Sequence, residues 1–152
     1  MRFNILTSPF WRYFLLPLGA NAERAFVEIA NGELNVRFGW PFKQSFPLDE
    51  VEGASPSHWP VLGGIGWRTN FRGNVGLIGT YVNIVEIRFK QPQRVRMFFP
   101  LNCSRLYVSI EDPRDFIAAL GKATDIAEQP KREAVAAAAN SRPRPRRRKK
   151  SG

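Results

Sequence analysis

The sequence predicts a mainly β fold, a small antiparallel barrel or sandwich that is capped by one C-terminal helix. Three observations indicate this fold. Short segments of alternating apolar and polar residues recur between residues 25 and 109, and Gly, Asn and Pro residues separate them. One segment with helical apolar spacing follows these segments. The chain has 152 residues, of which 43% are hydrophobic, so it can bury the core of one domain of ordinary size.

Residues 1–22 are interpreted as an apolar N-terminal arm that packs on the domain. The alternative is a cleaved secretory signal, because an apolar patch precedes Ala20-Asn21-Ala22, which has the small-x-small form of a cleavage site. Arg12, Pro9 and Pro17 interrupt that pattern and favour the arm. No stretch of the sequence reaches the ~20 apolar residues of a membrane-spanning helix.

The body begins with three predicted strands. Residues 25–29 and 34–38 flank Asn31-Gly32, the pair that best tolerates the positive φ angles of a tight hairpin turn. Apolar and polar residues alternate in the second strand, so its apolar residues are expected on one buried face. Residues 42–46 form a third extended segment, and residues 53–66 are predicted to be the longest loop.

Five further strands are predicted before the helix: residues 66–71, 75–78, 82–89, 94–99 and 105–109. The alternation changes phase near Ile84 and Val85, which predicts either a bulge or a strand buried on both faces. A turn about Pro92 places like charges opposite each other, Lys90 with Arg94 and Arg88 with Arg96. This basic stripe is a candidate anion-binding surface, and a solvated strand face is the alternative.

The helix is predicted from Asp112 onward. Asp112 can cap it, Pro113 suits its first position, and Asp115 favours the positive end of the helix dipole. An apolar stripe at helical spacing is then expected to face the core: Phe116, Ile117 and Leu120. The helix is expected to end at Gly121 or to continue with breaks to Ala127, and Pro130 ends it in either case.

Several segments resemble the bacterial pleckstrin-homology-like domains of unknown function. They are residues 30–39, 64–68 and 85–87, and above all residues 109–120 with their Asp-Pro-Arg-Asp-Phe helix entry. The resemblance covers roughly residues 23–120. It implies a bent antiparallel barrel of about seven strands with a C-terminal capping helix. Such scaffolds bind lipids, peptides or partner proteins, and the family has no catalytic motif.

The resemblance has one departure that concerns ligands. The first hairpin loop, residues 30–33, lacks the flanking basic side chains of phosphoinositide-binding members, and only Arg37 lies near it. The sequence therefore does not favour specific recognition of inositol phosphates. The predicted organisation is an arm over residues 1–22, a pleckstrin-homology-like domain over residues 23–127 and a disordered basic tail over residues 128–152.

No feature of the sequence points to an enzyme, a cofactor or a metal site. Cys103 and His58 are the only residues of their kinds, which excludes an intrachain disulfide and a zinc site built from several Cys and His residues. The glycine cluster of residues 63–66 lacks the following Lys-Ser/Thr of a phosphate loop and precedes a strand. Trp67 with Arg68 is interpreted as a buried Trp with an Arg packed over it, and a surface binding patch is the alternative.

The charge is concentrated in the tail. Residues 128–152 contain nine Lys and Arg against two Glu, a net +7, whereas the rest of the chain carries +3. After Asn140 no apolar group remains, which predicts disorder. Seven cations there are candidates for binding an anionic partner: Arg142, Arg144, Arg146, Arg147, Arg148, Lys149 and Lys150. The alternative is an Arg-rich tail without a binding role.

Three functions follow as hypotheses for a cytoplasmic protein. The first is a non-catalytic adaptor that contacts a protein partner and uses the tail for electrostatic attraction. The second is a peripheral binder of anionic membranes that uses the basic stripe and the tail. The third is a nucleic-acid-associated protein with little sequence specificity, because no aromatic residue follows Phe116 to stack on bases.

Overall fold

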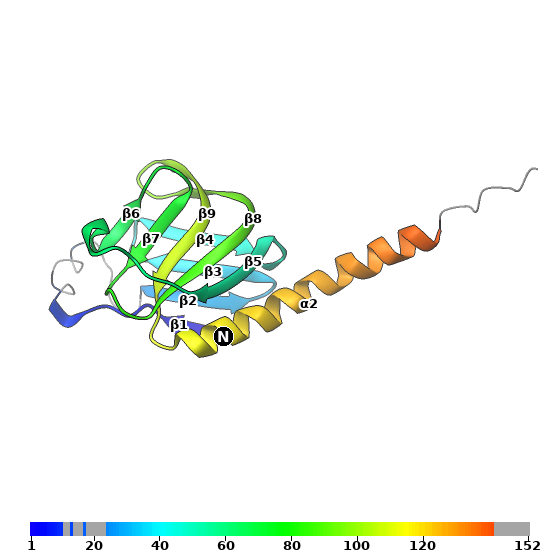
Figure 1. Cartoon of the computed structure of the whole chain (residues 1–152), viewed down its shortest axis with the longest axis horizontal. Coiled ribbons are helices and arrows are strands. Elements are labelled where there is room, and N and C mark those ends of the chain that lie inside the picture. Colours follow the sequence, from blue (N-terminus) through cyan, green and yellow to red (C-terminus); the bar gives the residue numbers. More distant parts are fainter. Residues whose placement is uncertain (11–12, 14–16, 18–23, 142–152) are drawn as a thin grey trace, which may run out of the picture.

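The structure, a computed structural model, describes residues 1–10, 13, 17 and 24–141. Within these residues, nine strands form two sheets that pack face to face as a sandwich (Figure 1). The four-stranded sheet has the order β1-β2-β3-β4, with β1 Arg2–Asn4, β2 Ala25–Ala30, β3 Glu33–Phe38 and β4 Phe42–Pro47. The mainly β prediction is confirmed. In the described part of the chain the sheets do not close into a barrel.

The second sheet has five strands in the order β5-β8-β9-β7-β6. Its strands are β5 Val51–Pro56, β6 Gly66–Thr69, β7 Asn74–Ile78, β8 Ile84–Arg96 and β9 Pro100–Ser109. Two short 3-10 turns, η2 Leu48–Glu50 and η3 Val61–Gly63, precede β5 and β6, and helix α2 spans Pro113–Asn140. The β7–β9 pair is parallel and all other pairs are antiparallel, so the prediction of a wholly antiparallel fold is wrong for this pair.

The four-stranded sheet forms as the local sequence predicts. Asn31 and Gly32 adopt φ angles of 54° and 76° in the β2–β3 turn, the left-handed region that this pair tolerates. The predicted apolar face of β3 is fully buried: Leu34, Val36 and Phe38. The described start of the arm joins this sheet, because Arg2–Asn4 pair with β2 as an edge strand. The Met1 ammonium group donates a hydrogen bond to the Ile29 carbonyl at 2.9 Å.

Three predictions about the second sheet need correction. Residues 53–56, the second part of β5, fall in the predicted loop of residues 53–66. They are extended because they pair with β8, although the segment is rich in Gly, Ser and Pro. Residues 82–89 and 94–99 were expected to be two strands, but β8 is a single strand whose register shifts between Arg88 and Gln93. Pro92 falls in that irregular region, where the pairing does not require its missing N–H. The chain reverses at residues 97–99 instead.

The core fills the space between the sheets and extends to the first half of α2. Phe38, Phe42 and Phe46 come from one sheet, and Leu77, Ile87 and Leu106 from the other, all of them buried. Ile84 and Val85 are both buried, which confirms the prediction of a strand covered on both faces at that point. Such burial of apolar surface is the main favourable contribution to folding.

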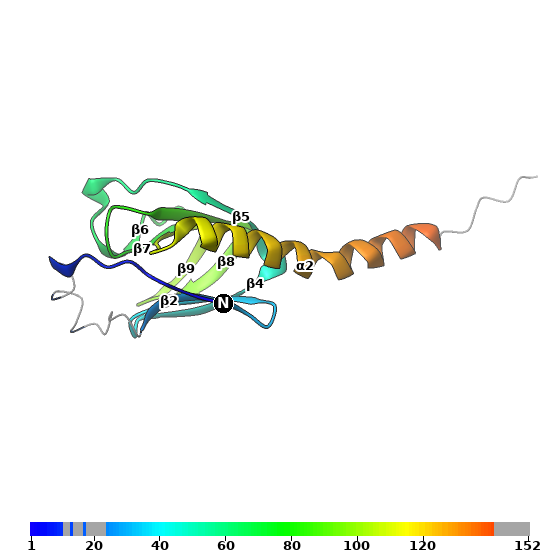
Figure 2. The same cartoon turned by 90° about the horizontal axis from the view of Figure 1, so that it is seen from below.

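Helix α2 lies along one edge of the sandwich and covers the core there. Figure 2 shows it between β5 on one side and β2 on the other. Phe116 and Leu120 are buried, as the helical spacing predicts, and the Phe116 ring packs edge-to-face on Phe3 with centroids 5.3 Å apart. Asp112 stands at the N-cap, yet its side chain makes no capping hydrogen bond, so that part of the prediction is wrong.

The helix is longer than predicted. It passes through Pro130 and ends at Asn140, so residues 128–140 are helical rather than part of a disordered tail. Pro130 cannot donate a hydrogen bond to the Ile126 carbonyl, which weakens the helix at that turn. The residues beyond it are mainly Ala, Lys, Arg and Glu, which favour helix and compensate for the loss.

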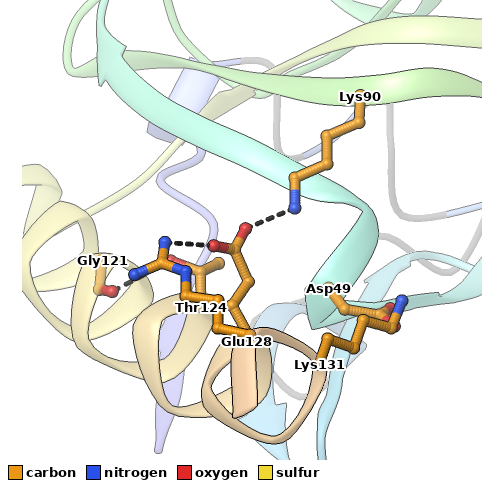
Figure 3. A network of polar contacts seen from close by, with 7 residues as sticks. Asp49, Lys90, Gly121, Thr124, Glu128 and Lys131 are labelled. Carbon is orange, nitrogen blue, oxygen red and sulfur yellow. Dashed lines mark hydrogen bonds and ion pairs between the residues drawn. The ribbon is translucent and has the colours of Figure 1, made fainter. Parts of the chain in front are cut away.

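A polar network on both sides of Pro130 fastens this part of α2 to the sandwich (Figure 3). Glu128 pairs with Lys90 of β8, and Lys131 pairs with Asp49 of η2. Arg132 also contacts Glu128, with a nitrogen-to-oxygen distance of 2.5 Å one helical turn away. These cations lower the pKa of the Glu128 and Asp49 carboxyl groups below their ordinary values. Beyond Arg132 the described helix projects from the sandwich.

Replacing Phe116 with Ala tests the contribution of the helix to the core. The side chain is fully buried, so the substitution leaves a cavity and should lower the free energy of unfolding by about 3–5 kcal/mol. Ile126→Ala on the same helix is the matched control, because that side chain is 66% exposed and its loss should change stability by no more than about 0.5 kcal/mol. Chemical denaturation measures both. Equal effects would contradict the burial of Phe116 in the core.

Acidification should release the second half of α2. Carboxyl groups with lowered pKa values stabilise the folded form above their ordinary pKa, and this contribution disappears as the pH falls through the lowered values. Backbone chemical shifts of residues 131–140 should therefore stay helical from pH 7 down to about 5 and lose helical character below about 4. Glu128→Gln should weaken the same segment at pH 7. Glu133→Gln is the control, because Glu133 forms no ion pair with a described residue.

Candidate functional site

The predicted basic stripe is divided among three places. Arg88 stands opposite Arg105 rather than Arg96, and it donates a hydrogen bond to the Ser55 hydroxyl at 2.9 Å. Lys90 turns to Glu128 of α2. The expected pairs about Pro92 are therefore wrong, because the strand does not reverse there. Arg94 and Arg96 remain exposed near the β8–β9 turn and form no ion pair with a described residue.

Four exposed aromatic residues gather at the same end of the sandwich. They come from three turns: Trp40, Phe71, Phe98 and Phe99. Their side chains are 61%, 71%, 60% and 44% exposed, respectively. We call these four residues the aromatic end. The Trp40 and Phe98 rings lie edge-to-face with centroids 6.1 Å apart, and the Phe71 and Phe99 rings stack at 5.8 Å, so the four rings form two pairs joined through the consecutive residues Phe98 and Phe99. Contiguous exposed apolar surface of this kind marks a binding surface more often than a requirement of the fold.

The segments that build the aromatic end carry only positive charges. The segments that build it, residues 37–47, 66–74 and 91–104, contain no Asp or Glu. The exposed cations in these segments include Lys43 of β4, Arg72 of the β6–β7 turn, and Arg94 and Arg96 of β8. The last two line a depression of about 420 Å³ together with Gln44, whose amide donates to the Arg96 carbonyl at 3.2 Å. An anionic surface therefore complements this end of the molecule.

The β6–β7 turn holds Phe71 outward at a conformational cost. Phe71 has a φ angle of 58°, which is rare for a bulky residue. The Asn70 side-chain oxygen accepts hydrogen bonds from the backbone N–H groups of Arg72 and Asn74 at 2.9 and 3.1 Å. Gly73, at a φ of 95°, accepts from the backbone N–H of Ser104 at 2.7 Å. These bonds fix a strained turn that presents an aromatic ring to solvent, and strain of this kind gathers at functional sites.

A second feature lies on the outer face of the five-stranded sheet. The register places Arg68, Gly76, Tyr107, Glu86 and Ser55 in one row across β6, β7, β9, β8 and β5. The loop of residues 57–65 folds over the first part of this row. It encloses a pocket of about 400 Å³ whose lining includes His58, Trp59, Arg68, Asn70, Asn74 and Tyr107.

Trp59 anchors the loop that forms this pocket. Its indole N–H donates to the Gly64 carbonyl at 3.0 Å, and its ring lies 5.3 Å from the ring of Tyr107. A Cβ atom on Gly76 would come within 2.8 Å of the Trp59 ring, so the indole packs directly on the backbone of β7. The sequence places Trp59 only in a loop. The glycines at positions 63, 64 and 76 are the sequence feature that points to this packing. They can be interpreted only when the strand register is known.

Glu86, the acidic residue of the row, is paired with two arginines. The Glu86 carboxylate lies 3.7 Å from Arg88 and 3.8 Å from Arg105. A hydrogen bond with Tyr107 and the nearby Glu86 charge raise the pKa of Arg105, and burial raises the pKa of the Tyr107 hydroxyl. Both groups therefore keep their ordinary neutral-pH forms, a guanidinium cation and a neutral phenol.

Other residues that the sequence singled out have separate places. Trp67 faces the core side and donates to the Phe38 carbonyl at 2.8 Å, whereas Arg68 lies on the opposite face, so Arg68 does not pack over Trp67. Cys103 is buried, and burial raises the pKa of its thiol to about 12, which keeps it protonated. His58 is exposed at the pocket. The seven tail cations lie outside the described residues.

Two findings apply to the part of the chain that the structure describes. No group of three or more His, Cys, Asp or Glu residues is placed there to hold a metal ion. No helix among the described residues has the length and apolar composition needed to cross a membrane. Comparison of the chain with protein-family models, with curated proteins and with solved structures finds no match.

Gly76→Ala and Gly121→Ala form a matched pair that tests the packing of Trp59. The first substitution forces the indole away from β7 and should lower the free energy of unfolding by about 1–3 kcal/mol. It should also shift the Trp59 indole N–H resonance, because its hydrogen bond to Gly64 is disturbed. At Gly121 nothing lies within 4 Å of the added methyl group, so Ala should stabilise the helix by about 0.5–1 kcal/mol. An unshifted Trp59 resonance in Gly76→Ala would contradict the packing.

Proposed function

We propose that the protein is a non-catalytic binding module that docks on an anionic membrane surface through the aromatic end, on the cytoplasmic side. One observation carries this proposal: three turns bring together two pairs of exposed aromatic rings, and the segments that form these turns contain cations and no Asp or Glu. Rings of Trp and Phe gain free energy when they enter the interfacial layer of a bilayer. Each nearby Lys or Arg contributes about 1 kcal/mol at a membrane rich in anionic lipid.

The shape of the aromatic end favours a membrane over nucleic acid. The rings lie on turns at one end of the sandwich, where they can enter a soft layer together. They also contact one another in two pairs, one edge-to-face and one stacked, so they do not stand apart as separate platforms for single bases. Single-stranded nucleic acid is bound in positively charged grooves with separate aromatic platforms.

The proposal includes a pleckstrin-homology-like scaffold. Support comes from the antiparallel β2–β3–β4 arrangement, the second sheet packed against it and the helix that covers one edge. The parallel β7–β9 pair departs from the antiparallel barrel that the resemblance implies. A scaffold of this type supplies a rigid frame for turns that bind a partner, and the ligand depends on the turns themselves.

The basic tail is the second binding element in the proposal. Helix α2 begins after β9, at the end of that strand opposite to the aromatic end, and runs past the sandwich before the tail starts (Figure 1). The last described turn of α2 therefore lies away from the aromatic end. This separation supports an adaptor role, in which the aromatic end is on the membrane and the seven cations of the tail attract a second anionic partner.

Co-sedimentation with vesicles tests the membrane proposal. The full chain should bind phosphatidylcholine vesicles that contain phosphatidylserine, and bind pure phosphatidylcholine vesicles more weakly. Binding should fall by roughly tenfold or more in the Trp40→Ala/Phe98→Ala variant, because two interfacial rings are lost. Leu62→Ala is the matched control, since Leu62 is fully exposed and lies outside the aromatic end. Arg94→Gln/Arg96→Gln should weaken binding only to the anionic vesicles.

Two results would overturn the membrane proposal. One is vesicle binding that is equal in the Trp40→Ala/Phe98→Ala variant and the Leu62→Ala control. The other is an aromatic-dependent affinity for single-stranded DNA with none for vesicles. A chain without residues 142–152 separates the contribution of the tail, whose loss should reduce the salt dependence of binding.

A further inference from the structure

We infer that the pocket under the loop of residues 57–65 is a second binding site, which takes the phosphate group of a small phosphate monoester. The pocket has a volume of about 400 Å³, which suits a compact organic molecule. It lies on the outer face of the five-stranded sheet and shares no lining residue with the four rings of the aromatic end. The inference is independent of the membrane proposal, because it rests on different side chains.

The electrostatics of the pocket favour an anion. Its lining contains the Arg68 guanidinium and the His58 imidazole, and no Asp or Glu. Arg68 uses its Nε–H to donate to the Ile65 carbonyl at 3.2 Å, and its two terminal nitrogens have no hydrogen-bond partner among the described residues. Glu86 stands beyond Tyr107 in the same row, where Arg88 and Arg105 flank it. Arg68 is exposed and has no counter-ion among the described residues, so its guanidinium is available to an anionic group that enters the pocket.

The number of donors distinguishes a phosphate from a carboxylate. Asn70 uses its side-chain oxygen for two backbone N–H groups, which leaves its NH₂ group as a donor at the pocket. Asn74 brings a second amide, and Arg68 brings its guanidinium fork. Together with His58, these groups offer more N–H donors than the two oxygens of a carboxylate can accept in one plane. The three terminal oxygens of a phosphate monoester can accept them from several directions.

A glycine of the loop makes room for the Arg68 guanidinium at the pocket. The guanidinium of Arg68 lies against Gly64, where a Cβ atom would come within 2.7 Å of it, so this glycine leaves room for the cation. Gly64 also has a φ of 76°, a conformation that glycine adopts without strain. Trp59, Pro60 and Tyr107 form an apolar side of the lining for the organic part of the ligand. A fixed cation beside an apolar wall reduces the ordering cost of binding.

Titration of the full chain tests the inference, with three probes that carry the same chemistry. Phenyl phosphate represents a soluble monoester, inorganic phosphate the group alone, and phosphatidylcholine vesicles containing phosphatidic acid a lipid headgroup. We expect phenyl phosphate to shift the Trp59 indole N–H resonance and to bind more tightly than benzoate. If phenyl phosphate binds and its binding depends on Arg68, the ligand is a soluble monoester. If only the phosphatidic acid vesicles show binding that depends on Arg68, the ligand is a lipid headgroup. Either result supports a phosphate site.

Variants assign the binding to the pocket. Arg68→Gln should weaken phenyl phosphate at least tenfold, Arg68→Lys should retain part of the affinity, and His58→Gln should weaken it less than Arg68→Gln. Arg114→Gln is the matched control, because Arg114 is exposed on α2 and lines neither the pocket nor the aromatic end. Equal affinity in Arg68→Gln and Arg114→Gln, or benzoate binding as tight as phenyl phosphate, would overturn the inference. The Trp40→Ala/Phe98→Ala variant should bind phenyl phosphate normally, so failure of one proposal is distinguishable from failure of the other.

Discussion

The position of β9 between β8 and β7 is the constraint on which both binding surfaces depend. Its antiparallel pairing with β8 and parallel pairing with β7 place Tyr107 beside Gly76 on one side and Glu86 on the other. The same register brings the β6–β7 turn level with the middle of β9, where the Gly73 carbonyl accepts hydrogen bonds from the backbone N–H groups of Ser104 and Arg105. The aromatic end and the pocket are thus two results of one strand insertion.

The two surfaces meet at the β6–β7 turn. Phe71 belongs to the aromatic end, and its neighbour Asn70 lines the pocket. The Asn70 side-chain oxygen stabilises the turn from within by accepting two backbone hydrogen bonds, so the residue that lines the pocket also fixes the turn that carries Phe71. A rigid turn of this kind positions groups for binding without an ordering cost at the moment of contact. Its strained Phe71 conformation is consistent with selection for a surface rather than for stability.

Helix α2 combines two different sources of stability. Its first half is held by apolar burial, with Phe116 and Leu120 in the core. Its middle is held by charge, because Glu128 and Lys131 pair with groups of β8 and η2 on the two sides of Pro130. Exposed ion pairs are individually weak, and here they act together on a turn that already lacks one backbone hydrogen bond. The last part of the described helix therefore depends on ionic conditions more than the sandwich does.

The sequence was enough to predict the buried face of β3, the burial on both faces at Ile84 and Val85, the Asn31-Gly32 hairpin, and the start and apolar face of α2, because periodicity and turn preference are local properties. It did not predict β5, the single long β8, the parallel β7–β9 pair or the continuation of α2 through Pro130. Each of these depends on partners distant in the chain. Arg94 and Arg96 were recognised as candidates, but the four aromatic rings and the Trp59 pocket came together only in the tertiary structure. Surface contacts between turns leave no periodic signal, since the register that joins them is a non-local property of the sheet.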